Sequence, residues 1–409
     1  TASTLTGLSQ AHHDSASKAL SRSMLSGDSL RRSFRHAVVE SSSLPPAERL
    51  IMYDACDSQE VSQSLGGSAG YRKRLDARRG NKPKKADNQR DVCTPFDHAA
   101  FNFSKISNQR EILAVLPEYN ILTNRFPLFP GHCLLTAKAL VPQQLSATHL
   151  SAIVRLVSHS GFSAYFNSWC ASASVNHFHC HLIDELPPVA QQRLVSGPRV
   201  LGEPTLRPAE SSGSCYVFGA SQLGLVGRAV SAMQAENQPH NLLFTPLHIY
   251  VWPKPLQRPA RSFDLYPETV GGPELVGSFT VYTERDFAKL SAAAADELVR
   301  INTAPLPERL LSGGDDTRPA TAPAAVEAAS SSSDESDSEA GPPPKQPRTA
   351  VRACQSLDSL SLVKLLRSGS GLDELTLPLA LSKSCLNRSG GLEACRRGVA
   401  RARRVPPPY

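Results

Sequence analysis

Apolar positions between residues 91 and 305 recur with periods that predict alternating helices and strands. Ser146 can cap a helix in which Leu150, Ile153, Val154 and Val157 form one apolar stripe. The other predicted elements are strands at 132–136, 175–183, 248–252 and 278–282, and helices at 223–234 and 284–302. Short connections favour antiparallel pairing, so the pattern predicts an α+β fold with helices packed on an antiparallel sheet.

The predicted strand at 175–183 carries three of the chain's 12 histidines. Side chains on a strand alternate between faces, so His177, His179 and His181 share one face, about 6.6 Å apart along the strand. The opposite face carries Asn176 and the apolar side chains of Phe178, Cys180 and Leu182, which can pack on the helix that follows Ser146. Each buried imidazole needs a hydrogen-bond partner, so a purely structural strand gains nothing from this arrangement.

Three kinds of chemistry fit such a face. Alternate histidines can converge on zinc, act as acid and base, or present a neutral imidazole that attacks phosphorus. The spacing of the histidines does not separate these alternatives.

Composition divides the chain into an ordered centre and two flanks. Residues 1–70 are rich in serine, and residues 306–350 combine proline, alanine, serine and acidic residues in a low-complexity run. Such segments bury too little apolar surface to offset the entropy lost on ordering. We therefore predict a variable N-terminal extension at 1–70, a catalytic domain at 71–305, a disordered linker at 306–350 and a basic, mostly disordered tail at 351–409.

The formal net charge is +7, and one short segment accounts for it. Residues 71–90 hold nine basic and two acidic residues. With Tyr71 as the only aromatic residue there, a small anionic substrate or a solvated loop is favoured over a nucleic acid. The nine cysteines include no CxxC pair, which fits a reducing, cytoplasmic compartment, and no apolar run is long enough to cross a membrane.

The sequence segments around the histidines are more informative about function than the spacing of the histidines. The segment Pro127-Leu-Phe-Pro-Gly131-His132-Cys-Leu-Leu135 precedes the predicted helix, and Asn176-His177-Phe-His179-Cys-His181 follows it. This order resembles the histidine triad superfamily of nucleotide hydrolases and transferases. The resemblance implies a histidine-triad-like sheet in which the middle histidine, His179, is the nucleophile toward the α-phosphorus of a nucleotide.

Further motifs resemble the GDP-hexose phosphorylase family, which includes GDP-D-glucose and GDP-L-galactose phosphorylases. They are Pro95-Phe-Asp-His-Ala-Ala-Phe-Asn-Phe-Ser-Lys105, Gly161-Phe-Ser-Ala-Tyr-Phe-Asn-Ser168, Ile249-Tyr-Val-Trp-Pro-Lys254 and Glu274-Leu-Val-Gly277. Two positions depart from the family pattern. Trp169 and Cys170 stand where a glycine is usual after Ser168, and Ser278 stands where a histidine is frequent.

The resemblance implies transfer of GMP from a GDP-hexose, GDP-glucose above all, to inorganic phosphate through a GMP–histidine intermediate on His179. The remaining candidate site residues are expected to bind substrate; they are His177, His181, Asn167, Ser168, Ser174 and Lys105. Lys254 is expected to be exposed. No metal or cofactor is required by this chemistry, and a monomer or homodimer is expected. A histidine-triad hydrolase that uses water, or a non-catalytic nucleotide-binding protein, remains the alternative.

Overall fold

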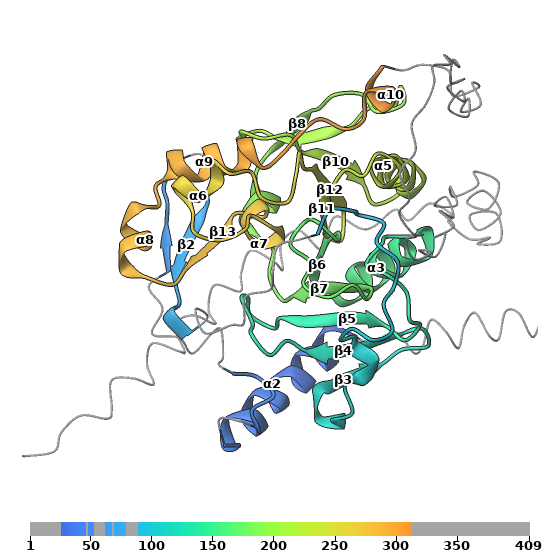
Figure 1. The fold of residues 1–409 in the computed structure, drawn as a ribbon, viewed down its shortest axis with the longest axis vertical. Helices are drawn as coiled ribbons and strands as arrows, with labels where there is room; N and C mark the ends of the chain where they lie inside the picture. Colours follow the sequence, from blue (N-terminus) through green and yellow to red (C-terminus); the bar gives the residue numbers. More distant parts are fainter. Residues whose placement is uncertain (1–25, 46–47, 53–61, 68, 79–88, 313–409) are drawn as a thin grey trace, which may run out of the picture. The chain divides into compact units, whose positions relative to one another are not determined.

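A ten-stranded antiparallel sheet runs through the protein, whose fold is described from a computed structural model (Figure 1). The structure describes residues 26–45, 48–52, 62–67, 69–78 and 89–312. The predicted C-terminal tail and most of the predicted low-complexity linker lie outside these residues. The strands, in spatial order, are β3 (Ile112–Val115), β4 (Tyr119–Thr123), β5 (Cys133–Ala137), β7 (His179–Ile183), β6 (Ser163–Asn167), β11 (His240–Phe244), β12 (His248–Pro253), β10 (Tyr216–Gly219), β9 (Leu206–Pro208) and β8 (Leu194–Ser196).

Two halves of this sheet repeat one unit of strand, helix, strand and strand. The first unit is β5, α3 (Ala147–Ser160), β6 and β7, and the second is β10, α5 (Leu223–Ala235), β11 and β12. The halves meet where β6 pairs with β11, and the order β5-β7-β6 is mirrored by β11-β12-β10. The duplication is thus visible in the topology, although no repeat is apparent in the sequence.

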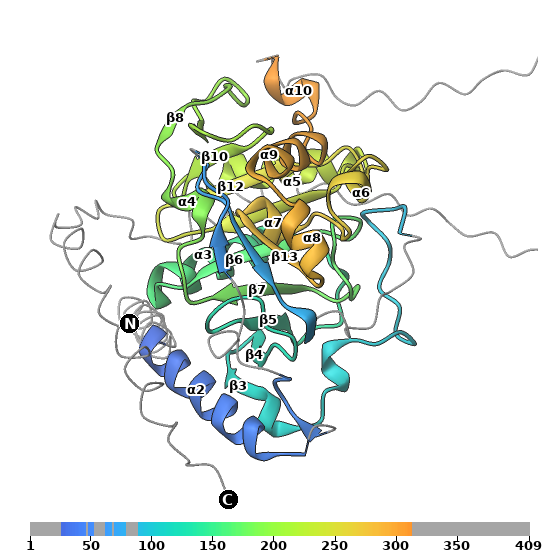
Figure 2. The same ribbon diagram turned by 90° about the vertical axis from the view of Figure 1, so that its left-hand side faces the viewer.

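One face of the sheet is covered by long helices. Apolar side chains of α3 and α5 share a core with the side chains of Phe166, Phe178 and Leu242. Helix α2 (Gly27–Ser43) joins the same core through Leu30 and Phe34 and lies beside β3, as Figure 2 shows. This helix lies within the segment predicted as an N-terminal extension, and its apolar face is buried with the rest of the domain.

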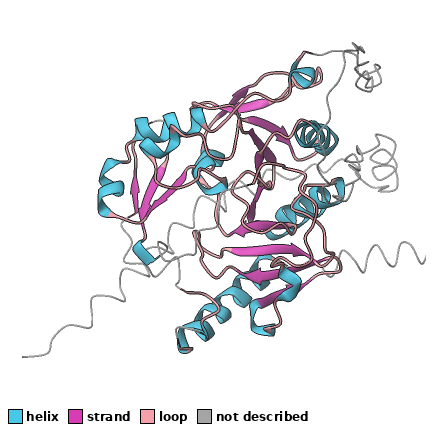
Figure 3. Ribbon diagram, viewed as in Figure 1, coloured by secondary structure: helices cyan, strands magenta, loops and turns pink. Residues whose placement is uncertain are grey.

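The opposite face of the sheet is covered by a second layer. It contains a three-stranded sheet of β1 (Ser62–Ser64), β2 (Arg72–Leu75) and β13 (Ser278–Val281), in which β2 and β13 are parallel. Short helices complete the layer and its end of the molecule, as Figure 3 shows by colour. They are α4 (Pro188–Gln191), α6 (Ser262–Leu265), α7 (Gly272–Leu275), α8 (Glu284–Lys289) and α9 (Ala292–Ile301). The short helix α10 (Glu308–Leu311) instead packs through Leu310 into the core that α3 and α5 share, and the 3-10 turns η3 (Phe103–Lys105) and η4 (Gln109–Glu111) lie elsewhere.

The predicted α+β class with antiparallel pairing is confirmed in the main sheet. Ser146 caps α3, where its hydroxyl accepts a hydrogen bond from the amide of His149. The helix predicted at 284–302 is wrong in one respect, because it is two helices, α8 and α9. Ser291 caps α9 and so begins a new helix directly after Leu290.

The histidine strand is shorter than predicted and begins only at His179. The preceding residues bend because the side chain of Asn176 binds three backbone groups. Its Nδ2 donates to the carbonyls of Thr94 and Pro95, and its Oδ1 accepts from the amide of Gln143. The Phe178 amide donates to the Val141 carbonyl in a loop, and its carbonyl accepts from the amide of Ala137 at the end of β5.

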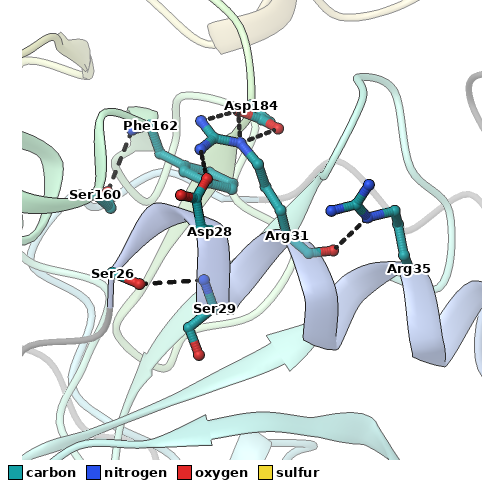
Figure 4. A network of polar contacts seen from close by, with 8 residues as sticks. All are labelled: Ser26, Asp28, Ser29, Arg31, Arg35, Ser160, Phe162 and Asp184. Atoms are coloured by element: carbon teal, nitrogen blue, oxygen red, sulfur yellow. Dashed lines mark hydrogen bonds and ion pairs between the residues drawn. The ribbon is translucent and has the colours of Figure 1, made fainter.

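Arg31 of α2 is tied to the end of β7, as Figure 4 shows. Its Nε and Nη2 lie 2.7 Å and 2.6 Å from the Asp184 carboxylate, and the guanidinium lies over the ring of Phe162. Asp184 also packs against Gly131, which has a φ of +61° and where an added Cβ would lie 2.7 Å from Asp184 Cβ. The N-terminal helix is therefore linked to the turn that precedes His132.

The stability of the folded protein is expected to fall at acid pH because a histidine, His240, is buried in the core. Burial lowers the pKa of His240 to about 4, against a smaller opposing effect of its hydrogen bond to the Gln238 carbonyl. Between pH 6.5 and 4 the unfolded chain binds a proton that the folded protein does not, so stability is lost as the pH falls. At about 1.4 kcal/mol per pKa unit, the loss is about 3 kcal/mol.

His240→Phe removes this titration. In chemical denaturation at pH 6.5 and pH 4, the variant should lose about 3 kcal/mol less unfolding free energy than the unmodified protein. Equal losses in the two proteins would contradict the assignment.

Candidate active site

The site lies where β7 and β6 run side by side in the first half of the sheet. Tyr165 is directly opposite His181, so these side chains share a face, and their rings stack at 4.4 Å between centroids. His179 lies next to them on the same face, with its ring centroid 5.4 Å from that of His181.

His179 is held in one tautomer by the backbone. Its Nδ1 lies 2.8 Å from the carbonyl oxygen of His177, and a carbonyl can only accept, so Nδ1 carries the hydrogen. In the neutral ring, Nε2 therefore carries the lone pair. This is the form that attacks an electrophile, and the ring is nearly buried at 3 % exposure.

Gln143 fixes the backbone at His179. Its side-chain oxygen accepts from the His179 amide at 2.8 Å, and its nitrogen donates to the His179 carbonyl at 2.9 Å. The same nitrogen donates to the Asn167 carbonyl at 2.8 Å. The side chain is fully buried, and it bridges β7 to β6 at His179, where β7 pairs with β5 but no longer pairs with β6.

His177 is engaged by the backbone at both ring nitrogens. Nε2 donates to the Ala139 carbonyl at 2.9 Å, and Nδ1 accepts from the Phe103 amide at 3.1 Å. Burial lowers the pKa of His177, although the Ala139 hydrogen bond opposes the shift. The structure thus places His177 as a brace between two loops, whereas the sequence predicts that it binds substrate.

His181 contacts a fourth histidine, His132, which the sequence placed at the start of a predicted strand and not among the site residues. His132 Nδ1 accepts from the Leu128 amide at 2.9 Å, so His132 carries its hydrogen on Nε2. That Nε2 lies 2.9 Å from His181 Nδ1, which must then accept, and neutral His181 carries its own hydrogen on Nε2. Asn124 Nδ2 lies 3.0 Å from the same atom of His132 as a competing donor. We assign the tautomer from the Leu128 contact, whose donor is a main-chain amide; the Tyr165 hydroxyl, 3.3 Å from Nε2, can then accept from the same hydrogen.

Of the other predicted substrate-binding residues, some lie next to the site and some bind only to the surrounding backbone. Asn167 lies on β6 next to the site, and its Oδ1 accepts from the Gly272 amide at 3.0 Å and from Asn241 Nδ2 at 2.7 Å. Ser168 is buried and accepts from the His240 amide at 3.0 Å. Ser174 is half-buried in the loop that leads to β7.

Lys105 is used within its own loop. Its Nζ donates to the carbonyls of His98, Ala99 and Ala100 at 3.2, 3.0 and 2.7 Å. The side chain holds the Pro95–Lys105 motif in shape, and its contact with substrate stays a prediction.

The loop between β6 and β7 departs from ordinary backbone geometry where the sequence departs from the family. Cys170 and Ser172 have φ values of +67° and +79°, in the left-handed region that favours glycine. Gln89 holds this loop, since its Oε1 accepts from the Cys170 amide and its Nε2 donates to the Ala173 carbonyl, both at 3.1 Å. The loop therefore keeps a glycine-type conformation without the glycine.

The basic segment is largely structural in its described part, 71–78. Arg72 pairs with Glu185 and donates to Ser278 at 2.5 Å, which places Ser278 beside a cation. Lys73 donates to the carbonyls of Phe287 and Leu290. Residues 79–88 lie outside the described residues.

Lys254 is fully buried, so the expectation of an exposed side chain is wrong. Its Nζ donates to the Val270 carbonyl, and burial lowers its pKa to about 7 against the opposing attraction of Glu274. Glu274 accepts from the Gly271 amide at 2.9 Å, so this pair holds the turn at Gly272. Gly272 must lack a side chain, because a Cβ there would lie 2.4 Å from the Tyr165 ring.

Within the described residues, no group of three or more histidine, cysteine or acidic side chains is placed to hold a metal ion. No helix in the described ranges is long and apolar enough to span a membrane.

Comparison with known proteins agrees with the motifs. A family model described as GDPGP1-like, N-terminal domain, matches residues 47–183. GDP-D-glucose phosphorylase 1 of Danio rerio is 33 % identical over 204 residues, which span 44 % of this chain and only 57 % of that relative. The Bos taurus protein of the same name is 27 % identical over 291 residues, or 58 % of this chain and 72 % of that relative.

A solved structure, yeast Ap4A phosphorylase Apa2, has a TM-score of 0.49 and 13 % identity, covering 68 % of this chain and 94 % of that one. The match to the family model is the informative one, since residues 47–183 hold His132, His177, His179 and His181. Residues 47–183 therefore match the model of a GDPGP1-like N-terminal domain, and the chain is similar to the GDP-D-glucose phosphorylases that its motifs resemble, of which it spans little more than half of the first relative's length.

Proposed function

We propose that this protein is a GDP-hexose phosphorylase that transfers GMP from GDP-glucose to inorganic phosphate through His179. One observation supports the assignment above all. The His177 carbonyl accepts the Nδ1 hydrogen of His179, which orients Nε2 as the nucleophile. The names of the sequence relatives supply the substrate class.

In the first step His179 Nε2 forms a bond to the α-phosphorus, and the bond from that phosphorus to the hexose 1-phosphate oxygen breaks. The ring becomes positively charged, and the His177 carbonyl stabilises it through the Nδ1 hydrogen. In the second step a phosphate oxygen attacks the same phosphorus, the P–N bond breaks, and GDP leaves. The sum is GDP-glucose plus phosphate giving GDP plus glucose 1-phosphate, with neutral His179 restored.

His181 is assigned as the donor to a phosphoryl oxygen. Its Nε2 carries the hydrogen because Nδ1 accepts from His132, so the donor is set before substrate binds. His132 acts through His181 and is a positioning residue in this scheme.

His132→Phe tests that role. The variant keeps a ring but loses the donor to His181 Nδ1, so we expect kcat to fall about 10- to 100-fold with a smaller change in KM. The pH profile of kcat should shift, because His181 is no longer fixed in one tautomer. An unchanged pH profile with an unchanged kcat would contradict the role.

The function itself is tested with purified protein and GDP-glucose, with and without phosphate, by separating GDP, GMP and glucose 1-phosphate. GDP formed only with phosphate supports the phosphorylase. GMP formed without phosphate supports the hydrolase, and nucleotide binding without turnover supports a binding protein. Either of the last two results rejects the proposal.

We also propose a cytoplasmic location and a monomer or homodimer. Four described cysteines are buried and in no disulfide, which suits a reducing compartment; they are Cys133, Cys170, Cys180 and Cys215. Microscopy of the tagged full chain and sedimentation of the purified protein test these two points.

A further inference from the structure

An exposed phenylalanine lies one ring away from the nucleophile. The Phe103 ring centroid is 5.0 Å from that of His179, and the Phe101 ring is 5.8 Å from Phe103 in an edge contact. Phe101 is 52 % exposed, whereas Phe103 is half-buried. A solvent-exposed aromatic ring at this position has a face available for stacking on a flat ligand group.

The loop that carries Phe101 is held at several points. The Phe103 amide donates to His177, and Ser104 donates to Asn102, whose side chain is buried. Lys105 binds three carbonyls of the same loop. The exposed position of Phe101 is therefore part of a braced conformation, next to the ring that contacts His179.

We propose that Phe101, supported by Phe103, is the stacking surface for the nucleobase of the substrate; this rests on the proposed function and deepens it. The face of an aromatic ring carries partial negative charge, so it does not suit a phosphate. A hexose needs hydrogen-bond partners, and Lys105 and Asn102 already use theirs within the loop. A base offers a flat π-face to an aromatic ring, whichever base it is.

Stacking contacts the face of the base and not the polar groups at its edge. The stacking contact should therefore contribute equally to the affinity for guanine and for adenine nucleotides. Phe101→Ala should raise the dissociation constants of GMP and AMP by the same factor, about 5- to 100-fold, which is the usual size of one base stack. The dissociation constant of glucose 1-phosphate should stay within twofold. In turnover, KM for GDP-glucose should rise while kcat changes little, because Phe101 does not touch the reacting atoms.

The test is titration calorimetry of GMP, AMP and glucose 1-phosphate with three variants of the full chain. Phe101→Trp keeps a stacking ring and should retain GMP affinity. Val115→Ala removes a side chain that is 66 % exposed on β3, and it is the control for loss of exposed apolar surface. Thermal unfolding of Phe101→Ala should match that of the unmodified protein.

GMP binding that Phe101→Ala leaves unchanged overturns the inference, as does binding that Phe101→Trp fails to retain. Unmodified protein that binds neither GMP nor AMP also overturns it. Failure of the proposed function gives a different result, in which GMP binding depends on Phe101 but GDP-glucose is not cleaved with phosphate.

Discussion

His179→Ala should lose GDP-glucose phosphorolysis by roughly a thousand-fold or more, because no other group on that face replaces the covalent step. The site around residue 179 should stay largely in place, because Gln143 binds the backbone of that residue and not its side chain. Nucleotide affinity should therefore change much less than kcat. The measurement is kcat for GDP formation together with the dissociation constant of GMP.

The covalent intermediate gives an independent readout. Without phosphate, the unmodified protein incubated with GDP-glucose should gain the mass of one GMP moiety, and His179→Ala should not. His159→Ala removes an exposed histidine from α3 and is the matched control, which should behave as the unmodified protein does. Full turnover by His179→Ala would refute the mechanism in either enzymatic form.

Gln143→Ala should be the most destabilising polar substitution at the site. It leaves three buried backbone groups without this partner: the amide and carbonyl of His179 and the carbonyl of Asn167. Each unsatisfied buried group costs about 1–3 kcal/mol, so a loss on the order of 3–5 kcal/mol is expected. Denaturant unfolding measures this loss, and kcat should fall as well because β7 loses its first anchoring point.

Gln144→Ala is the control, since Gln144 is the next residue in the chain and its side chain is only half-buried. Gln143→Met keeps the volume of the side chain and removes its polar groups, so it separates packing from hydrogen bonding. A midpoint of Gln143→Met equal to that of the unmodified protein would show that the hydrogen bonds do not matter, and would contradict the prediction.

Local patterns predicted those parts of the fold that depend on neighbours in sequence. Helix α3 begins at Ser146 as predicted, because its cap and its apolar stripe both lie within the segment. The apolar side of the histidine strand packs on that helix, as alternation predicts. The break between α8 and α9 was missed, since the apolar pattern continues through the new cap at Ser291.

The features that could not be predicted from the sequence depend on contacts between residues far apart in the chain. Asn176 bends the chain before His179 by binding Thr94 and Pro95, about 80 residues away in sequence. Nothing in the sequence distinguishes Gln143 from Gln144, although only the first reaches the backbone of β7. The ammonium of Lys254 can be buried because it donates to the Val270 carbonyl and is attracted by the charge of Glu274. No pattern in the sequence around Lys254 indicates either partner.

The two halves of the sheet have a consequence for stoichiometry. A dimer of identical small subunits with this unit would carry two equivalent nucleophiles, one in each half. Among the strands that the structure describes, only β7 carries alternating histidines, while β12, its counterpart, carries His248, Tyr250 and Trp252 at alternate positions. The internal duplication has thus become asymmetric, and one chain should take up one equivalent of GMP on its nucleophile, with the second half serving as its permanent partner.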